Sequence, residues 1–399
     1  MAHAPDARSK TQSVSTPPAA QGDETLAALS DRALSALNDQ ALAALIDQAL
    51  IRAGGWLGFD AFMALALYAP GLGYYANQRR KFGLMPQSGS DFVTAPELSP
   101  LFGRALAAQV RQALTATETD TVLEFGAGSG ALAEQLLTTL GDAVRWYQII
   151  DLSGVLRERQ AQRLAKFGAR VQWLDSLPDQ IRGVVLGNEV LDAMPVQLLH
   201  FDGELWQERG LVAGAAPGQW AWANRPSTLT PPLPGPYLPG MVTEVHPQAE
   251  AFVRTLAGVL QKGLALFVDY GFPEAEYYHP QRHQGTLMCH QAHRADDNPL
   301  VDVGQKDITA HVNFTGLALA GQDGGLDVAG YSSQANFLFN CGLVELMGPA
   351  SLAERAMAQR LVNEHEMGEL FKVLAFTRGI DLAQTPLLGF TQGDRSHRL

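Results

Sequence analysis

A glycine-rich segment, residues 126–130 with the sequence GAGSG, directly follows a short apolar run that ends in Glu124 and Phe125. This pattern is typical of a strand that leads into a helix, where glycine lets the backbone turn tightly and approach a ligand. Asp151 stands 21 residues after Gly130, at the end of the next predicted strand. An acid at that distance can accept hydrogen bonds from both hydroxyls of a ribose. These residues therefore predict a site for a ligand that contains a ribose.

Two classes of cofactor use this geometry. A dinucleotide places its pyrophosphate over the glycine turn, whereas S-adenosylmethionine has no phosphate and places its amino-acid part there. Glu124 favours S-adenosylmethionine, because a carboxylate suits a cationic ligand and disfavours a pyrophosphate. A Gly-x-Gly-x-Gly spacing after an acid also resembles motif I of class I methyltransferases. Two alternatives remain: the dinucleotide variant Gly126-x-Gly128-x-x-Ala131, and a structural turn without a ligand.

The elements around this turn alternate between strand and helix. Apolar runs at residues 121–125, 146–150, 171–174 and 184–186 predict strands, and residues 130–140 and 155–167 predict helices between them. Late strands are expected at 264–269, 326–328 and 371–377, and late helices at 314–320, 333–339 and 352–363. Such alternation predicts an α/β fold with a doubly wound, mostly parallel sheet.

Three regions depart from the alternation. Residues 1–23 are rich in Ala, Ser, Pro and Gln and predict a disordered tail. Residues 24–115 predict a helical cap with a long loop, and 116–399 a methyltransferase core. We expect insertions in this core at about 200–245, containing a hairpin within 201–222, and at 274–312, a long polar loop.

Composition excludes several classes of protein. The chain of 399 residues is 46% hydrophobic with a net charge of −12, which argues against a nucleic-acid binder but allows a basic protein substrate. Only two cysteines, Cys289 and Cys341, are present, so a reducing compartment is expected. No apolar run is long enough to span a membrane, and the N-terminus lacks the pattern of a secretory signal. We predict a bacterial cytoplasmic protein, with the mitochondrial matrix less favoured.

Further motifs resemble one known family. They are GLGYY at 71–75, GSDFVTAPE at 89–97, GNEVLDAMPV at 187–196, VDYG at 268–271, GTL at 285–287 and DITAHVNF at 307–314. Together they resemble the MidA-like class I methyltransferases of bacteria and mitochondria. The mitochondrial member of that family is a complex I assembly factor that symmetrically dimethylates an arginine of a complex I subunit. The resemblance extends from about Ile46 to Gly379.

The resemblance implies a seven-stranded class I methyltransferase sheet and S-adenosylmethionine as cofactor. Two departures stand out: Asp151 replaces the glutamate expected before Leu152-Ser153, and Met288-Cys289-His290 replaces a segment with Arg and Tyr. The predicted donor-binding residues are Thr94, Glu97, Glu124, Phe125, Gly126, Ala127, Gly128, Ser129, Asp151, Leu152, Asp175, Ser176 and Asn188. Asp175 or Ser176 is expected at the adenine, and Thr94 with Glu97 either closes over the donor or only begins a helix.

Acids in the fourth-strand motif suit an arginine substrate. A carboxylate pair that grips a guanidinium orients one nitrogen and localises the charge. Glu189 follows a strand of the sheet, where open α/β sheets bind ligands. We predict that Glu189 holds the guanidinium, with Asp192 or Glu244 as second acid. Asp192 could instead cap a helix, and Glu189 could be structural.

The histidines indicate a role in the site less clearly than the acids do. Asp307 and His311 are four residues apart and could share a helix face. His311 could act as a base or contact the substrate, or it could be a structural residue. The histidines of residues 279–293 form no closed set of zinc ligands, so no metal is predicted. The favoured function is a protein arginine methyltransferase whose partner is a protein such as a complex I subunit. The alternatives are an assembly factor with a vestigial donor pocket and a small-molecule methyltransferase.

Overall fold

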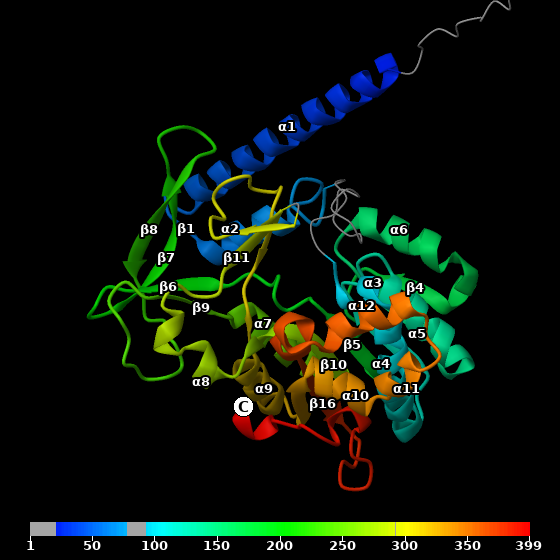
Figure 1. Cartoon of the computed structure of the whole chain (residues 1–399). Helices are drawn as coiled ribbons and strands as arrows, with labels where there is room; N and C mark the ends of the chain where they lie inside the picture. The colour runs from blue at the N-terminus through cyan, green and yellow to red at the C-terminus, as the bar shows by residue number, and fades with distance from the viewer. Residues whose placement is uncertain (1–20, 78–92, 292) are drawn as a thin grey trace, which may run out of the picture.

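A twisted sheet forms the centre of the protein, seen in a computed structural model that describes residues 21–77, 93–291 and 293–399. Eight strands form this sheet, in the order β15-β16-β10-β5-β2-β3-β4, with the short β14 beside β10. Figure 1 labels β4, β5, β10 and β16 of this sheet. The strands are β2 Thr121–Phe125, β3 Trp146–Ile150, β4 Val171–Leu174, β5 Ile181–Asn188, β10 Leu260–Phe272, β14 Val312–Asn313, β15 Asp327–Ser333 and β16 Phe371–Arg378.

Strand directions confirm the predicted doubly wound, mostly parallel sheet. β2 runs parallel to β3 and β5, and β5 runs parallel to β10. Only β16 is antiparallel to its neighbours β10 and β15. The seven strands predicted from the sequence are present, and two-residue β14 adds an eighth. Because β2, β3, β5 and β10 are parallel, the loops after them meet at one edge, where such sheets bind ligands.

Helices cover both faces of the sheet, as the alternation predicts. Val122 of β2 packs in one apolar cluster with α4, α5, α10 and α12, and Leu123 packs in another with α7 and α9. Successive residues of a strand point to opposite faces, so β2 is buried on both sides. The helices are α4 Pro100–Thr117, α5 Ala131–Leu140, α6 Gly154–Leu164, α7 Pro247–Val259, α9 Phe314–Asp323, α10 Gln334–Asn340, α11 Leu343–Met347 and α12 Leu352–Val362.

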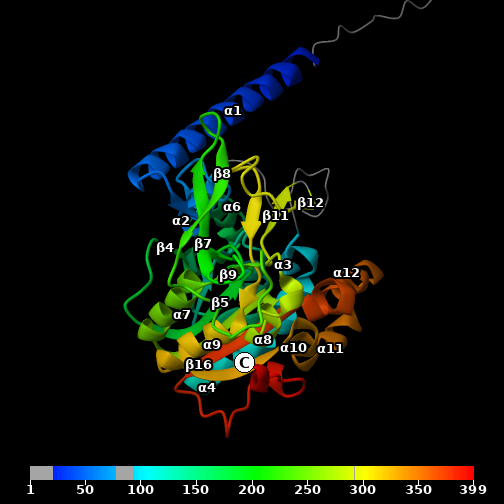
Figure 2. The same cartoon turned by 90° about the vertical axis from the view of Figure 1, so that its left-hand side faces the viewer.

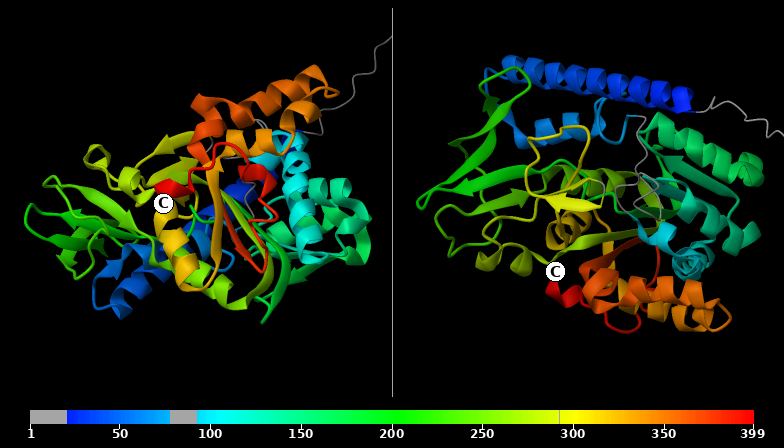
Figure 3. Two further views of the ribbon diagram at one scale, coloured as in Figure 1. Left: turned by 90° about the horizontal axis from the view of Figure 1, so that it is seen from below. Right: turned by 45° about the horizontal axis from the view of Figure 1, so that its top comes forward.

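The first insertion is larger than the hairpin predicted for residues 201–222. Its four strands join β1, from the N-terminal region, in a separate antiparallel sheet of five strands that stands at the side of the core (Figure 3). The strands are β1 Leu57–Gly58, β6 Gln197–Phe201, β7 Trp206–Ala213, β8 Trp220–Pro226 and β9 Val242–Val245. The hairpin is therefore only part of the sheet. The sequence pattern could not show that β1, more than a hundred residues earlier, pairs with β7.

The second insertion contains short strands where we predicted a long polar loop. Its strands β11 Met288–Gln291, β12 Arg294–Asp296 and β13 Asp307–Thr309 form a small antiparallel sheet, preceded by helix α8 Glu274–Tyr277. Asp307 therefore lies in a strand, and His311 lies just before β14. The prediction that Asp307 and His311 share a helix face is wrong, because strand pairing with β11 determines this segment.

The N-terminal cap consists of α1 Gln21–Arg52, α2 Phe59–Tyr68 and α3 Ala95–Leu98. Leu42, Ile46 and Leu50 of α1 pack against α2 and the inserted sheet, and Figure 2 shows α1 lying across this end of the molecule. Residues 1–20 of the predicted tail lie outside the described residues, and the described part of the chain includes residues 21–23 in α1. None of the helices in the described segments is long and apolar enough to cross a bilayer.

Candidate active site

The glycine turn connects β2 to α5 in the way that its sequence predicts. Gly126, Gly128 and Gly130 all have positive φ, at 60°, 55° and 82°. A Cβ at Gly126 would lie 3.1 Å from Val190 Cγ2. The turn therefore requires glycine both for its backbone angles and for its close approach to the loop after β5.

Asp151 is held in place at the end of β3. Its Oδ1 accepts from the Ser153 backbone N–H at 2.9 Å, and its Oδ2 accepts from Gln160 Nε2 at 2.8 Å. Gln160 Nε2 also donates to the carbonyl of Gly128 at 3.0 Å, which ties the acid to the glycine turn. Burial raises the pKa of Asp151, while the Ser153 and Gln160 bonds oppose the shift. The carboxylate keeps further lone pairs for two ribose hydroxyls.

Glu124 lies beneath the glycine turn and is 2% exposed. The Tyr147 hydroxyl donates to Glu124 Oε2 at 2.6 Å. Burial raises the pKa of Glu124 to about 7, although the bond from Tyr147 opposes the shift. A nearby cation would stabilise the ionised form. This environment fits the cationic ligand that the sequence favours.

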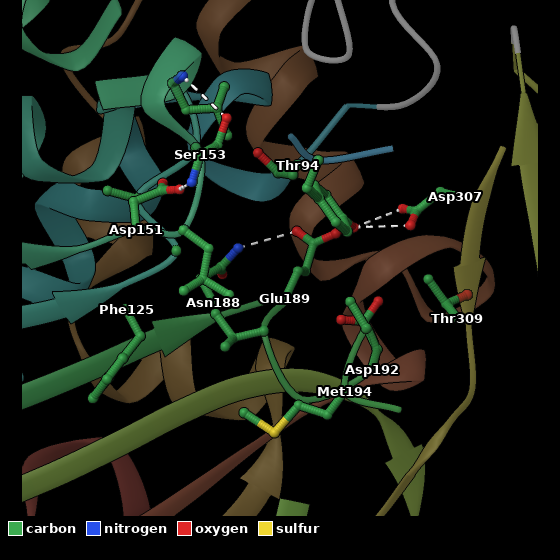
Figure 4. Close-up of a pocket in the computed structure, with 18 of the residues that line it drawn as sticks. Thr94, Phe125, Asp151, Ser153, Asn188, Glu189, Asp192, Met194, Asp307 and Thr309 are labelled. Carbon is green, nitrogen blue, oxygen red and sulfur yellow. Dashed lines mark hydrogen bonds between the residues drawn. The ribbon is translucent and has the colours of Figure 1, made fainter. Parts of the chain in front are cut away.

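A cavity of about 870 Å³ lies over the edge where the parallel strands end. In Figure 4, Phe125 and Asp151 lie on one side, Asp192, Asp307 and Thr309 on the other, and Glu189 between them. We call the first side the donor half, lined by residues 124–129, 150–153 and Asn188. We call the second the acid half, lined by Tyr68, Tyr75, Asp192, Tyr270, Asp307 and His311, and Glu189 faces both. Among the predicted site residues, the cavity brings together Thr94, Glu124, Phe125, Gly126, Ala127, Gly128, Ser129, Asp151, Leu152, Asn188, Glu189, Asp192 and His311.

Three predicted donor contacts are absent from the cavity wall. Asp175 is exposed and forms a 2.6 Å ion pair with Arg157, and Ser176 is also exposed. Glu97 accepts from the Ser129 hydroxyl and from Arg163, so it supports the glycine turn from behind. Thr94 lies in the wall and also precedes α3, where it forms no side-chain cap.

Glu189 adopts a left-handed backbone conformation, with φ of 54°. Such a conformation costs a non-glycine residue about 1 kcal/mol and is concentrated at functional sites. The Asn188 side-chain amide donates to Glu189 Oε1 at 3.1 Å. Burial, then the nearby Asp192 carboxylate, raises the pKa of Glu189 to about 8. The site thus holds an acid whose ionised form would be stabilised by a bound cation.

Two further acids complete the acid half, and each is held by a tyrosine. The Tyr270 hydroxyl donates to Asp192 Oδ2, and the Tyr75 hydroxyl lies 2.9 Å from both carboxylate oxygens of Asp307. Burial raises the pKa of Asp192. Asp192 Oδ1 is buried and has no hydrogen-bond partner among the described residues. No described helix begins at Asp192, so the alternative that it caps a helix is wrong.

Asp269, at the end of β10, holds the loop that carries Glu189 and Asp192. Its Oδ2 accepts from the backbone N–H groups of Val190 at 3.1 Å and Leu191 at 2.9 Å. Asp269 is 1% exposed, and burial and the Asp192 charge raise its pKa well above the ordinary value. It therefore acts as a positioning residue that fixes the strained backbone of this loop.

His311 lines the acid half as a neutral ring. Burial and the charge of Arg282 lower the pKa of His311 to about 4. The ring stacks on Phe272, with centroids 5.2 Å apart. Its Nδ1 is buried without a hydrogen-bond partner in the described part of the chain. A neutral imidazole can contact a cationic substrate without repelling it.

Glu244, the other suggested second acid, does not reach the cavity. It is fully buried in β9 and accepts from the backbone of Thr286 and Leu287. Its suggested role as a substrate acid is therefore wrong. Within the described residues, no group of three or more His, Cys, Asp or Glu is arranged to hold a metal.

Sequence reasoning missed the residues that support the acids. The sequence places Tyr75 in the GLGYY motif and Asp269 and Tyr270 in VDYG, but the motifs alone predict no separate role for them. Their contacts join segments 78 or more positions apart in sequence. The available signal was the clustering of tyrosine and acid within these motifs.

Comparison with known proteins identifies the family. The sequence profile of a family described as "Putative S-adenosyl-L-methionine-dependent methyltransferase" matches residues 101–332, more than half of the chain. The chain belongs to this family. A crystallised protein from Burkholderia thailandensis bound to S-adenosyl-homocysteine is 47% identical, with a TM-score of 0.86 over 92% of this chain and 98% of that one. A native crystal structure from the same organism is 45% identical, with a TM-score of 0.83 over the same shares.

Curated relatives are more distant. "Protein arginine methyltransferase NDUFAF7, mitochondrial" of Danio rerio is 26% identical over 392 residues, 83% of this chain and 88% of the relative. The human protein of that name is 25% identical over 370 residues, 79% and 78% of the two chains. The predicted MidA-like resemblance and class I methyltransferase fold are confirmed. S-adenosylmethionine is the methyl donor of this family, as the sequence predicted.

The donor half suits this cofactor. The glycine turn lets the backbone approach an amino-acid group, and Asp151 offers carboxylate oxygens to a ribose. Glu124 is buried beneath the turn and favours positive charge nearby. Leu152 lines the cavity and is 78% exposed, so an adenine ring could cover its apolar surface.

Proposed function

We propose that the protein transfers the methyl group of S-adenosylmethionine to a guanidinium nitrogen of an arginine residue in a protein substrate. The observation that carries this proposal is the acid half, where Glu189, Asp192 and Asp307 line one cavity next to the donor half. The curated relatives are named as protein arginine methyltransferases, which supports the same substrate class.

Carboxylates at this position favour a cationic substrate over a neutral one. Burial and the nearby Asp192 charge raise the pKa of Glu189, because they make its ionised form less stable. A cation that binds between the acids offsets this cost and favours the ionised form. A guanidinium can donate paired hydrogen bonds to a carboxylate, which fixes its plane as well as its position. Glu189 faces both halves of the cavity, so a guanidinium bound to it lies next to the donor half.

Methyl transfer to a guanidinium requires loss of one proton. The attacking nitrogen forms a bond to carbon as the carbon–sulfur bond breaks, and the methylated product returns to a single positive charge when its N–H proton leaves. Asp192 Oδ1 is buried, lines the acid half and has no hydrogen-bond partner within the described residues. Asp192 is the acceptor that we assign to this proton.

The cofactor, when bound, supplies a methyl group on a positively charged sulfur. The residues of the chain align the two reactants and keep water away. Phe125 and Phe252 pack edge to face at 5.0 Å and line the cavity beside the turn, which keeps this part of the site apolar. Asp269 keeps Glu189 in place throughout, because its bonds go to the loop rather than to a ligand.

Incubation with tritium-labelled S-adenosylmethionine and a pool of arginine-centred peptides tests the proposal. The wild type should label the peptides, and acid hydrolysis should yield methylarginine. Glu189→Gln should abolish labelling while calorimetry finds unchanged donor affinity. The exposed Glu204→Gln is the matched control and should behave as the wild type.

Two other experimental outcomes would contradict the proposal, and each would support a different function. Labelling only of small molecules in a cell extract would assign a small-molecule methyltransferase. Donor binding with no labelled product from peptides or extract would assign an assembly protein that retains its pocket. A complex I subunit is one protein substrate to include in the assay.

A further inference from the structure

The strands of the second insertion present one face to the cavity and the other to the cap. In the register of β11 and β13, Met288 lies opposite Thr309 and His290 opposite Asp307. All four line the cavity, and Asp307 and Thr309 lie on the side of the acid half. Cys289 and Ile308, the pair between them, are buried in the apolar cluster formed with α1 and α2. This alternation makes the two-strand face, which we call the β11–β13 wall, one side of the acid half.

A buried carboxylate from another element holds the start of this wall. Glu244 of β9 accepts from the Thr286 backbone N–H at 2.8 Å and from the Leu287 N–H at 3.0 Å, directly before β11. It also accepts from the Tyr277 hydroxyl at 2.8 Å and the Thr286 hydroxyl at 3.1 Å. Burial raises the pKa of Glu244, and these bonds oppose the shift. The acid therefore joins the inserted sheet to the second insertion.

The same network reaches the wall at a second point. Thr286 Oγ1 accepts from the His311 backbone N–H at 3.0 Å, so the segment before β11 also fixes the residue after β13. A Cβ at Gly285 would lie 2.4 Å from Glu244 Oε1, which shows how closely the turn is packed on the carboxylate. Both ends of the wall thus depend on the position of one side chain.

We infer that the β11–β13 wall contacts the polypeptide next to the target arginine, with His290 as a specificity-determining residue and Glu244 as the positioning residue that holds the wall. This inference rests on the proposed arginine methyl transfer. The donor half lies on the opposite side of the cavity, with Glu189 between it and the wall, so the wall can contact the substrate chain. Burial lowers the pKa of His290, which leaves a neutral ring able to donate or accept a hydrogen bond.

Kinetics with a pool of arginine-centred peptides tests the recognition step. His290→Ala should raise the peptide KM about tenfold with little change in kcat, because contacts with flanking residues contribute binding rather than chemistry. Glu244→Ala should raise the peptide KM by about the same factor through displacement of the wall. Glu244→Gln, which keeps one acceptor oxygen for the two backbone N–H groups, should recover most of the loss. Calorimetric affinity for S-adenosylmethionine should stay unchanged in all three variants.

Glu208→Ala is the matched control, since Glu208 is a buried acid of the same inserted sheet, bonded to Arg225 and absent from the cavity wall. It should destabilise the protein without changing the peptide KM. Hydrogen–deuterium exchange of the full chain should be faster across residues 288–291 and 307–309 in Glu244→Ala, and not in Glu208→Ala.

The outcomes separate two kinds of failure. If the wild type methylates peptides and neither His290→Ala nor Glu244→Ala changes the KM, the wall does not recognise substrate. If exchange across the wall is unchanged in Glu244→Ala, the positioning role is wrong. If the wild type methylates no arginine peptide, the proposed function itself fails, and recognition of an arginine protein fails with it.

Discussion

Replacing Glu189 with Gln should make the protein more stable as well as inactive. In the folded protein, burial and the Asp192 charge raise the pKa of Glu189 from 4.5 to about 8. An acid with a raised folded-state pKa binds more protons in the folded than in the unfolded chain between those two values. The free energy of unfolding therefore falls as pH rises from about 4.5 to about 8. A glutamine at this position carries no charge, so it makes no contribution to a fall in the free energy of unfolding over that range.

The size of the effect follows from the shift. Each pKa unit corresponds to about 1.4 kcal/mol, so the full shift corresponds to about 5 kcal/mol. Glu189 is only partly shielded from solvent, and water in the cavity screens the charge. We therefore expect a gain of about 2 kcal/mol for Glu189→Gln above pH 8. With an unfolding entropy of about 0.8 kcal/mol/K for a chain of this length, the melting temperature should rise by about 2–3 °C.

Scanning fluorimetry at a series of pH values measures this difference. The gap between Glu189→Gln and the wild type should be near zero at pH 4.5, widen up to about pH 8 and then stay constant. The exposed Glu204→Gln removes the same group far from the cavity and should give a gap that does not widen in this way. If Glu189→Gln and the wild type have the same melting temperature at pH 8.5, the ionised Glu189 does not destabilise the folded protein and the reasoning is refuted.

Three further predictions concern the same cavity. The peptide kcat/KM should rise with pH up to about 8, because the free enzyme must ionise Glu189 to bind a guanidinium; a flat profile between pH 6 and 9 would contradict this role. Asp151→Asn should weaken donor binding by about tenfold in calorimetry, since two ribose hydroxyls lose a charged acceptor; unchanged affinity would remove Asp151 from the site. Asp269→Ala should lower kcat by about a hundredfold with donor affinity retained, because two backbone N–H groups of the loop with Glu189 lose the carboxylate that accepts from them; an unchanged kcat would show that the loop keeps its conformation without Asp269.

Local patterns predicted the parts of the fold that depend on local sequence. Strands 121–125 and 146–150 begin and end as expected, because each is an apolar run bounded by polar residues or glycine. The glycine turn was equally visible, since its function requires one residue type at fixed spacing. Glu189 was recognisable from its place after a strand, although its positive φ was not.

Contacts between distant segments escaped prediction. The second insertion appeared as a polar loop because its strands are only three or four residues long and carry mixed side chains. Their order depends on packing of Cys289 and Ile308 against the cap, which no local pattern reveals. The prediction of Glu244 as a substrate acid was wrong for the same reason. The sequence around an isolated acid in a strand does not show which backbone N–H groups will donate to it.

The distribution of acids gives a physical reason for the division of the cavity. The Asp151 carboxylate accepts hydrogen bonds from Ser153 and Gln160, so this acid of the donor half is held in place before any ligand binds. The partly shielded Glu189 and the buried Asp192 instead lie close enough for the Asp192 charge to raise the pKa of Glu189, and Asp192 Oδ1 is unpaired among the described residues. A protein selected only for stability would remove such a pair, because each uncompensated charge costs free energy. Keeping the pair is consistent with a cation that regularly binds between the acids, and the destabilisation predicted at Glu189 is then offset when the arginine substrate binds.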